Sequence, residues 1–237
     1  MKRFTPVLAL CVALGAVEFT YAQKLTLDDF STGAYRKTLP TSNAGSDINL
    51  QKGAMIGGER ETQFLACHHI PCTTAENQFG QTSGFQVRPS KKTGVPSALI
   101  FSAGYKMFPR LDVFYGVNGG ITPLHLDLTR YDRLRVSYDG LNSVVNFNLE
   151  LFSPTGSGIL GCNLTSPTGS FPFTVDFPLK DFVGGGGGPI DLSDITLMDM
   201  ISQSGGVADL GTLTFAITKF EAIPPSVPPA TLSCTGH

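Results

Sequence analysis

Short segments in which apolar and polar residues alternate follow one another through the second half of this 237-residue chain. Alternation with a period of two places successive side chains on opposite faces of a β-strand. Clusters of Gly, Pro, Asn or Ser separate the segments, as turns separate strands. The segments are 126–132, 133–138, 145–151, 171–177, 194–198 and 213–217. The pattern predicts an all-β sandwich with long loops and few or no helices.

The first half of the chain carries weaker strand signals. Two stretches are rich in β-branched and aromatic residues, which favour strands, and three other segments are further candidates. Strands are therefore expected at 25–30, 61–66, 83–87, 98–102 and 111–115. Residues 31–60 have little periodicity and predict mostly loop, and the glycine run at 184–188 predicts a flexible connection.

The N-terminus has the pattern of an export signal. Lys2 and Arg3 precede an apolar run at 7–14, and Thr20 and Ala22 are small residues at the positions that matter for cleavage before residue 23. The apolar run is too short to span a bilayer. We therefore expect residues 1–22 to be a signal peptide, with no membrane insertion after cleavage. The mature protein would be secreted, in the periplasm or outside the cell.

The remaining chain reads as one domain with a tail. Residues 23–223 show no internal repeat and no composition break that would mark a second domain. Residues 224–237 begin with a proline-rich stretch, which is extended and lacks the N–H donors of a central strand. We expect a single β-sandwich domain followed by a C-terminal tail.

The charge balance excludes one class of partner. The chain has 17 basic and 19 acidic residues, and loss of Lys2, Arg3 and Glu18 with the signal would give a net charge of −3. Proteins that bind nucleic acid carry basic surfaces that neutralise phosphates. A nucleic-acid partner is therefore not expected, and no sequence signal defines an oligomeric state.

Four cysteines remain in the exported chain: Cys67, Cys72, Cys162 and Cys234. An even number in an oxidising compartment indicates disulfides, and three pairings are possible. We favour Cys67–Cys72, which closes a short loop, and Cys162–Cys234, which would tie the tail to the sandwich. A metal site at 67–72, where two histidines lie between the cysteines, is the alternative.

Several segments, in order, resemble the galactose-binding-like jelly rolls. The branch concerned contains carbohydrate-binding modules and the complex I intermediate-associated assembly factor family. The entry strand of that branch is similar to L-D-L-T-R-Y-D-R-L, and its later strands are similar to F-T-V-D-F-P-L-K-D-F and D-L-S-D-I-T. The matching positions are 55–58, 126–134, 173–182, 191–196 and 215–217.

The resemblance implies a concave sheet that binds glycans and a structural calcium ion joining the first and last strands. Asp28, Asp29 and Glu221 are the candidate calcium ligands, since calcium prefers oxygen ligands; the alternative is solvated charges at strand ends. The chain departs from the family in having no Trp. It also has Thr218 and Lys219 where the family has an acidic last-strand position.

A set of polar residues alternates out of phase with the apolar ones and would lie on the non-core faces of the strands. Such side chains can hydrogen-bond sugar hydroxyls; the alternative is an ordinary solvated face with cross-strand ion pairs. The predicted ligand-binding residues are Arg133, Arg135, Asn146, Asn148, Glu150 and Asp176, with Ser137 and Thr174 beside them.

These features together predict an exported, non-catalytic β-sandwich that acts as a carbohydrate-binding or cell-surface interaction module. Its partner would be a glycan or a cell-surface polymer. One alternative is a structural or adhesive envelope protein. Another is a polysaccharide-cleaving enzyme that uses Glu150 and Asp176 as paired carboxylates. The sequence has neither an H-E-x-x-H nor a G-x-S-x-G motif.

Overall fold

The computed structural model describes residues 23–40, 46–67, 80–116, 122–167, 171–204 and 212–234. The predicted signal peptide, residues 1–22, and Cys72 lie outside these ranges. The described strands are β1 (Leu25–Asp28), β2 (Tyr35–Pro40), β3 (Ser46–Lys52), β4 (Glu59–Leu65), β5 (Thr82–Arg88), β6 (Ala98–Ala103), β7 (Arg110–Gly116), β8 (Arg133–Leu141), β9 (Val145–Ser153), β10 (Gly156–Leu164), β11 (Phe173–Pro178), β12 (Val183–Gly187), β13 (Leu197–Ser204), β14 (Leu213–Ile223) and β15 (Leu232–Ser233).

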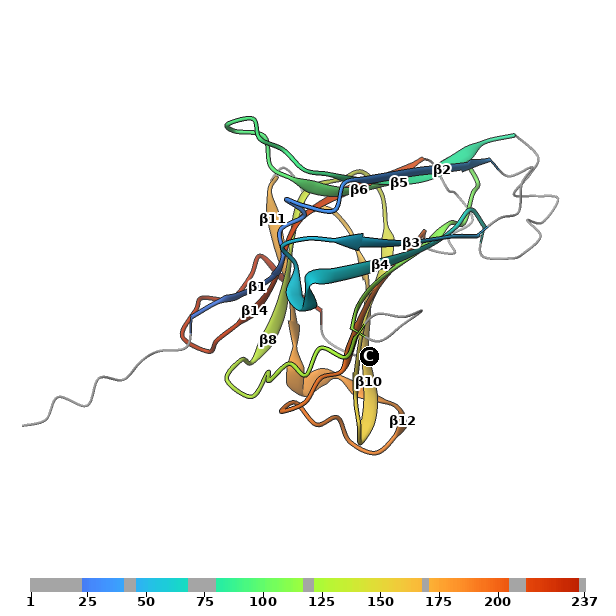
Figure 1. Cartoon of the computed structure of the whole chain (residues 1–237). Coiled ribbons are helices and arrows are strands. Elements are labelled where there is room, and N and C mark those ends of the chain that lie inside the picture. The colour runs from blue at the N-terminus through green and yellow to red at the C-terminus, as the bar shows by residue number, and fades with distance from the viewer. Residues whose placement is uncertain are drawn as a thin grey trace, which may run out of the picture.

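The strands form two sheets that pack face to face, so the predicted all-β sandwich is confirmed. The eight-stranded sheet has the order β15-β11-β8-β14-β6-β5-β2, with β1 also paired to β14. The seven-stranded sheet has the order β12-β10-β9-β13-β7-β4-β3. In Figure 1, β2 to β5 lie at one end of the sandwich and β10 and β12 at the other.

The connections between the sheets give the jelly-roll order. Strands β6, β14, β8 and β11 are neighbours in one sheet, and β7, β13, β9 and β10 are neighbours in the other. The chain passes back and forth between these two sets, as in a double Greek key. Two 3-10 turns, Ile56–Gly58 and Leu179–Asp181, are the helical elements of the described ranges. No helix in these ranges has the length and hydropathy of a membrane-spanning segment.

Apolar side chains of alternate positions fill the space between the sheets. The main core is a contiguous cluster to which most strands contribute, and Ala66, Cys67 and Met107 form a small second cluster. Phe101 stacks on Phe215 with ring centroids 4.9 Å apart, and Tyr138 stacks on Phe173 at 5.1 Å. Aromatic pairs of this kind add about 0.5–1.5 kcal/mol beyond the area they bury. The polar residues between these positions are thereby directed to the two outer faces.

Three sequence predictions about local structure were wrong. Residues 31–60 contain β2 and β3, the edge strands of the two sheets, where half-exposed positions give weak periodicity. Residues 126–132 form only an isolated bridge between Leu126 and Ile195. The glycine run includes edge strand β12. A Cβ on Gly156, which pairs with Gly187, would lie 1.9 Å from the Gly188 carbonyl oxygen, so glycines permit this close approach.

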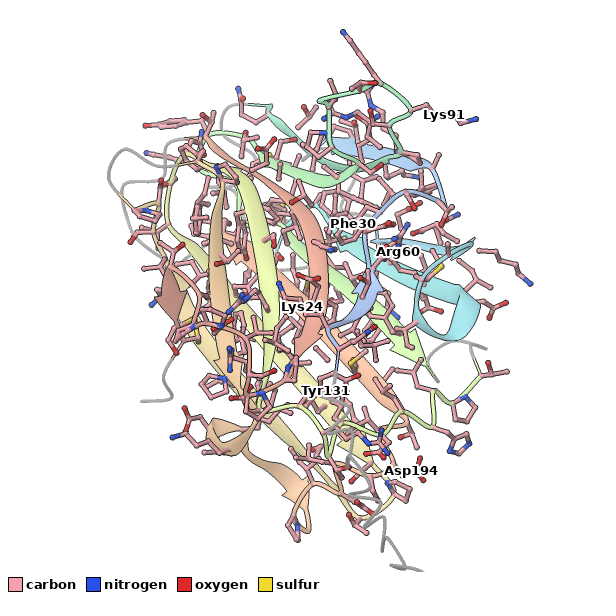
Figure 2. All side chains as sticks on the ribbon, turned by 90° about the vertical axis from the view of Figure 1, so that its left-hand side faces the viewer. Lys24, Phe30, Arg60, Lys91, Tyr131 and Asp194 are labelled. Carbon is pink, nitrogen blue, oxygen red and sulfur yellow. A yellow bond between two sulfur atoms is a disulfide. The ribbon has the colours of Figure 1, made fainter. Side chains whose placement is uncertain are left out.

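A buried ion pair between Asp28 of β1 and Arg60 of β4 connects the two sheets. The Arg60 guanidinium donates from Nη1 to Asp28 Oδ2, and the Tyr115 hydroxyl donates to the same oxygen at 3.0 Å. Arg60 lies 5.3 Å from the ring centroid of Phe30, and Figure 2 shows the two residues side by side. Burial raises the pKa of Asp28, whereas the Arg60 charge acts to lower it. Each charge compensates the other, since burial of either one without a partner would have a large desolvation cost.

Candidate functional site

The structure divides the predicted ligand-binding residues between the two outer faces of the sandwich. Asn146, Asn148 and Glu150 lie on β9 in the seven-stranded sheet. Arg133 and Arg135 lie on β8, and Asp176 on β11, in the eight-stranded sheet. The predicted ligand-binding residues therefore do not share one surface, because β8 and β9, which are adjacent in sequence, belong to different sheets.

Arg133, Arg135 and Asp176, the predicted residues of the eight-stranded sheet, bind the C-terminal tail. Arg135 donates from Nε and Nη2 to the two carboxylate oxygens of Asp176, at 2.6 and 2.9 Å. Its Nη2 also donates to the Pro228 carbonyl at 2.7 Å, and the Ala230 N–H donates to Asp176 Oδ2 at 2.7 Å. Asp176 and Arg135 are 3% and 7% exposed. These side chains are occupied by the tail, which the sequence did not indicate.

Arg133 completes the attachment of the tail. It donates from Nη2 to the Val227 carbonyl and, at 3.2 Å, to the Pro228 carbonyl, and its Nε lies 3.0 Å from Asp176 Oδ2. Beyond these contacts, β15 pairs in parallel with β11 at the sheet edge. Val175 and Leu232 are partners in that pairing. The tail thus joins the sheet at its margin rather than at its centre.

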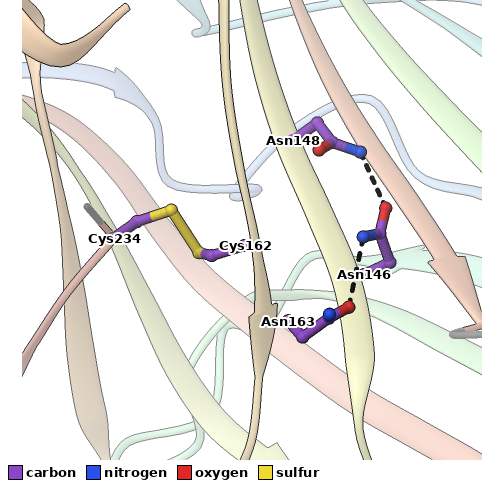
Figure 3. Close-up of a disulfide and its surroundings, with 5 residues drawn as sticks. All are labelled: Asn146, Asn148, Cys162, Asn163 and Cys234. Carbon is purple, nitrogen blue, oxygen red and sulfur yellow. Dashed lines mark hydrogen bonds between the residues drawn. A yellow bond between two sulfur atoms is a disulfide. The ribbon is translucent and has the colours of Figure 1, made fainter. Parts of the chain in front are cut away.

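The predicted disulfide between Cys162 and Cys234 is present, with a Cα–Cα distance of 5.8 Å. Cys162 lies in β10 of the seven-stranded sheet, whereas Cys234 follows β15 of the other sheet, so the bond links the two sheets (Figure 3). Cys67 is also disulfide-bonded. Because Cys72 lies outside the described residues, the Cys67–Cys72 pairing stays a prediction.

The three candidate calcium ligands do not converge. Strands β1 and β14 are neighbours, as the calcium hypothesis required. However, Asp28 points into the core toward Arg60, whereas Glu221 lies on β14 beside Lys219, with which it forms an ion pair at 2.9 Å. Asp29 accepts a hydrogen bond from the Ser31 N–H. These residues do not fit a shared calcium ion, and no group of three potential metal ligands occurs among the described residues.

The proposed glycosidase pair is also separated. Glu150 lies on β9 of one sheet, and Asp176 lies on β11 of the other. Two carboxylates that cleave one glycosidic bond must flank it from a single site. This pair therefore cannot act together, because the thickness of the sandwich lies between the two residues.

The outer face of the seven-stranded sheet gathers polar side chains from neighbouring strands, and we call it the polar face. Glu150 of β9 is the register partner of Asp199 in β13, and Asp199 is the partner of Phe114 in β7. Two residues before Glu150 on β9, Asn148 is the register partner of Ile201, and Ile201 is the partner of Asp112 in β7. The polar face consists of Glu61, Gln63, Arg110, Asp112, Phe114, Asn146, Asn148, Glu150, Asn163, Asp199, Ile201 and Gln203.

A ladder of amides crosses one end of this face. Asn148 donates from Nδ2 to Asn146 Oδ1 at 2.8 Å, and Asn146 donates from Nδ2 to Asn163 Oδ1 at 3.2 Å (Figure 3). Gly161 makes the arrangement possible, because a Cβ at that position would lie 1.8 Å from Asn148 Oδ1. The ladder fixes the orientation of amide groups that can both donate and accept hydrogen bonds.

Carboxylates occupy the middle of the face. Arg110 donates from Nε to both oxygens of Asp112, at 2.8 and 2.9 Å. Asp199 is 5% exposed, and its Oδ1 has no hydrogen-bond partner within the described residues. Burial raises the pKa of Asp199 to about 9, with further contributions from the charges of Asp112 and Glu150. Burial likewise raises the pKa of Glu150. The face therefore presents a protonated acid beside carboxylates.

Sequence reasoning missed part of this face. The strand containing Asp199 was expected to end at residue 198, and Asp112 was treated only as part of a strand. The alternation in 111–115 and in 197–203 carried the signal, since Asp112, Asp199 and Gln203 all lie out of phase with the core residues. Phe114 lies half-buried on the polar face, whereas the next residue, Tyr115, is in the core.

No protein-family model and no curated protein matches the chain. Several solved structures do. One is the family 11 carbohydrate-binding module of cellulosomal cellulase Lic26A-Cel5E of Clostridium thermocellum. It is 12% identical, with a TM-score of 0.38, over 85% of this chain and 95% of that chain. An agarase, AgWH50C, is 13% identical, with a TM-score of 0.38, over 87% of this chain and 25% of that chain.

A metagenome-derived glycoside hydrolase family 12 endoglucanase is 11% identical, with a TM-score of 0.31, over 78% of this chain and 98% of that chain. Likenesses at this level concern the β-sandwich fold and transfer no residue roles. The resemblance to the complex I assembly factor branch stays a prediction.

Proposed function

We propose that this protein is an exported module that binds a neutral polysaccharide through the polar face. The observation that carries the proposal is a band of amides and acids over three adjacent strands. It comprises Asn163 of β10, Asn146, Asn148 and Glu150 of β9, and Asp199 of β13. Neighbouring strands lie about 4.8 Å apart. A polymer lying across the strands would meet a new polar group at each one.

The chemistry of the face suits sugar hydroxyls. Each hydroxyl both donates and accepts a hydrogen bond, and the amides, the carboxylates and protonated Asp199 supply both roles. The unpartnered Asp199 oxygen would gain a partner from a bound hydroxyl, since a buried polar atom without one is costly. Half-buried Phe114 supplies apolar contact for the C–H groups of a sugar ring.

The charge of the face selects among polysaccharides. Among the residues that define the face, the carboxylates Glu61, Asp112 and Glu150 outnumber the single cation Arg110, and Asp199 is protonated at neutral pH. Like charges brought together repel, and more strongly where the groups are partly buried. A uronic-acid or sulfated polymer would therefore bind poorly, which makes a neutral glycan the favoured class.

Isothermal titration against soluble polysaccharides tests the proposal. The probes are mixed-linkage β-glucan, xyloglucan and galactomannan, with alginate as the anionic comparison. We expect at least one neutral polymer to bind, and Asn148→Ala and Glu150→Gln to weaken its binding about tenfold or more. The matched control is Asp139→Asn, an exposed acid on β8 in the other sheet. Failure of folded protein to bind any neutral polymer, or equal binding by all variants, would refute the proposal.

Assembly is the second candidate function. Edge strand β3 carries Ile48 and Leu50, which are 62% and 44% exposed. An exposed apolar edge strand can pair with another chain. If assembly is the function, sedimentation velocity without sugar will show oligomers that grow with concentration, and Ile48→Lys will abolish them.

A further inference from the structure

The outer face of the eight-stranded sheet contains a pocket of about 520 Å³. It lies on the side of the sandwich opposite to the polar face, and Figure 2 views this sheet from outside, with β8 and β14 side by side. Six hydroxyl side chains from separate segments line the pocket: Ser31, Ser97, Ser137, Thr174, Thr218 and Thr231.

The floor of the pocket is set by the pairing of three strands. Thr174 of β11 is the register partner of Ser137 in β8, and Ser137 is the partner of Lys219 in β14. The register shifts between Ile217 and Lys219, so Thr218 is the extra residue of a bulge. Bulges re-aim side chains and are common beside binding sites. Here Thr218 and Lys219, which are consecutive in sequence, both line the pocket.

The tail forms one wall of the pocket. The Thr231 N–H donates to Thr174 Oγ1 at 3.3 Å, and Thr231 follows the segment that Arg135 and Asp176 hold. On another side, Ser31 lies beside Asp29, whose carboxylate accepts the Ser31 N–H at 2.9 Å. The walls are therefore fixed by hydrogen bonds.

The lining residues have balanced charges, and their hydroxyl groups can both donate and accept hydrogen bonds. Asp29 and Lys219 are the two charged residues among the described lining residues, one an acceptor and the other a donor. Lys219 is already paired with Glu221 at 2.9 Å, which reduces its attraction for an anion. Hydroxyls that both donate and accept match the hydroxyls of a polyol. The lining thus favours a neutral, hydroxyl-rich ligand.

Apolar groups complete the pocket. Pro96, Pro172 and Phe173 contribute to the lining. The Phe173 ring itself is buried and stacks on Tyr138 in the core, so the two prolines supply the apolar surface that a sugar ring could contact. Ligand pockets of small molecules have volumes of about 300–1,000 Å³, and this one lies in the range for one or two sugar rings.

We propose that this pocket is a second saccharide site, which binds a neutral monosaccharide or disaccharide on the sheet opposite to the polar face. Binding here does not require the polar face. If both sites bind, one molecule would hold two glycan segments on opposite sides, a consequence that rests on the proposed function.

Ligand-observed NMR by saturation transfer tests the second site. The probes are glucose, galactose, cellobiose, lactose and maltose, added to the folded mature chain. We expect at least one to bind. Ser137→Phe should abolish binding by filling the floor, and Asp29→Asn should weaken it about tenfold, since it removes a charged hydrogen-bond partner. Thr214→Phe is the control, because Thr214 is exposed on β14 outside the pocket.

Gly161→Ala, which disturbs the polar face, distinguishes the second saccharide site from the proposed polysaccharide site. Disaccharide binding that survives Gly161→Ala and disappears in Ser137→Phe supports the second site. Binding that disappears in Gly161→Ala and survives in Ser137→Phe overturns the second site and leaves the proposed function standing. Lack of binding of every probe to folded wild-type protein also overturns it. If Ser137→Phe does not fold, Asp29→Asn and Thr218→Val replace it in both comparisons.

Discussion

Arg135 and Asp176 face one another across β8 and β11 and form a two-pronged ion pair, with N–O distances of 2.6 and 2.9 Å. Each of the two also bonds to the C-terminal tail. The pair therefore joins two neighbouring strands and a segment about 50 residues or more further along the chain. Hydrogen bonding to Asp176 also raises the pKa of Arg135.

Asp176→Asn is expected to destabilise the fold and release the tail. The substitution leaves the largely buried Arg135 guanidinium without its carboxylate, whereas Arg133 keeps its ion pair with Asp132. Loss of one partner of a buried pair costs about 3–5 kcal/mol. Urea unfolding gives the free energy, and proteolysis of the native protein reports tail release. Asp139→Asn is the control. Unchanged stability together with a protected tail would contradict this account.

Removal of the disulfide by Cys162→Ser with Cys234→Ser is expected to lower the free energy of unfolding by about 4 kcal/mol. The bond closes a loop of 72 residues, so its loss restores chain entropy to the unfolded state. Urea unfolding of both proteins without reductant measures the difference. With reductant, the wild type should approach the double variant, and a persisting difference would point to another cause.

Asp199 is expected to make stability fall as pH rises. Burial raises its pKa from 3.8 to about 9, so between these values the folded chain holds a proton that the unfolded chain has released. The free energy of unfolding then decreases with pH, by up to about 1.4 kcal/mol per pH unit from this group. Unfolding measured from pH 5 to 9 should show this slope, and Asp199→Asn should flatten it. A slope equal in both proteins would show that Asp199 is not the group responsible.

Asp28→Asn should lower the free energy of unfolding more than Tyr115→Phe does. The first leaves the buried Arg60 guanidinium without its ion-pair partner and should cost about 3–5 kcal/mol. The second removes one hydrogen bond to the carboxylate and should cost about 1.5–3 kcal/mol. Urea unfolding of both variants checks the order. A milder effect of Asp28→Asn would argue against a central role for the ion pair.

Gly161→Ala tests the polar face without changing its polar groups. The added Cβ would displace Asn148, which lies 1.8 Å from that position, and so disturb the amide ladder. We expect polysaccharide affinity to fall about tenfold or more while the fold is kept. Gly140→Ala is the matched control, because a Cβ there meets nothing within 4 Å. Equal affinity in both variants would exclude a role for the ladder.

The alternation of side chains was sufficient to predict the class of the fold. In 145–151 and 213–217 the apolar residues recur every second position, and each such strand buries one face. The even cysteine count and the position of the tail likewise favoured the Cys162–Cys234 bond that the structure contains. These are local properties of the chain, because period and spacing do not depend on which strands become neighbours.

Only the tertiary structure decided which polar residues share a surface. Arg135 and Asn148 each alternate with the core residues of their own strand, so both point away from the core. They nevertheless lie on opposite sides of the sandwich because β8 and β9 belong to different sheets. Asp199 joins Glu150 through a strand pairing that spans some 50 residues of chain. Alternation reports whether a side chain faces the core, and strand order alone determines which side chains meet outside it.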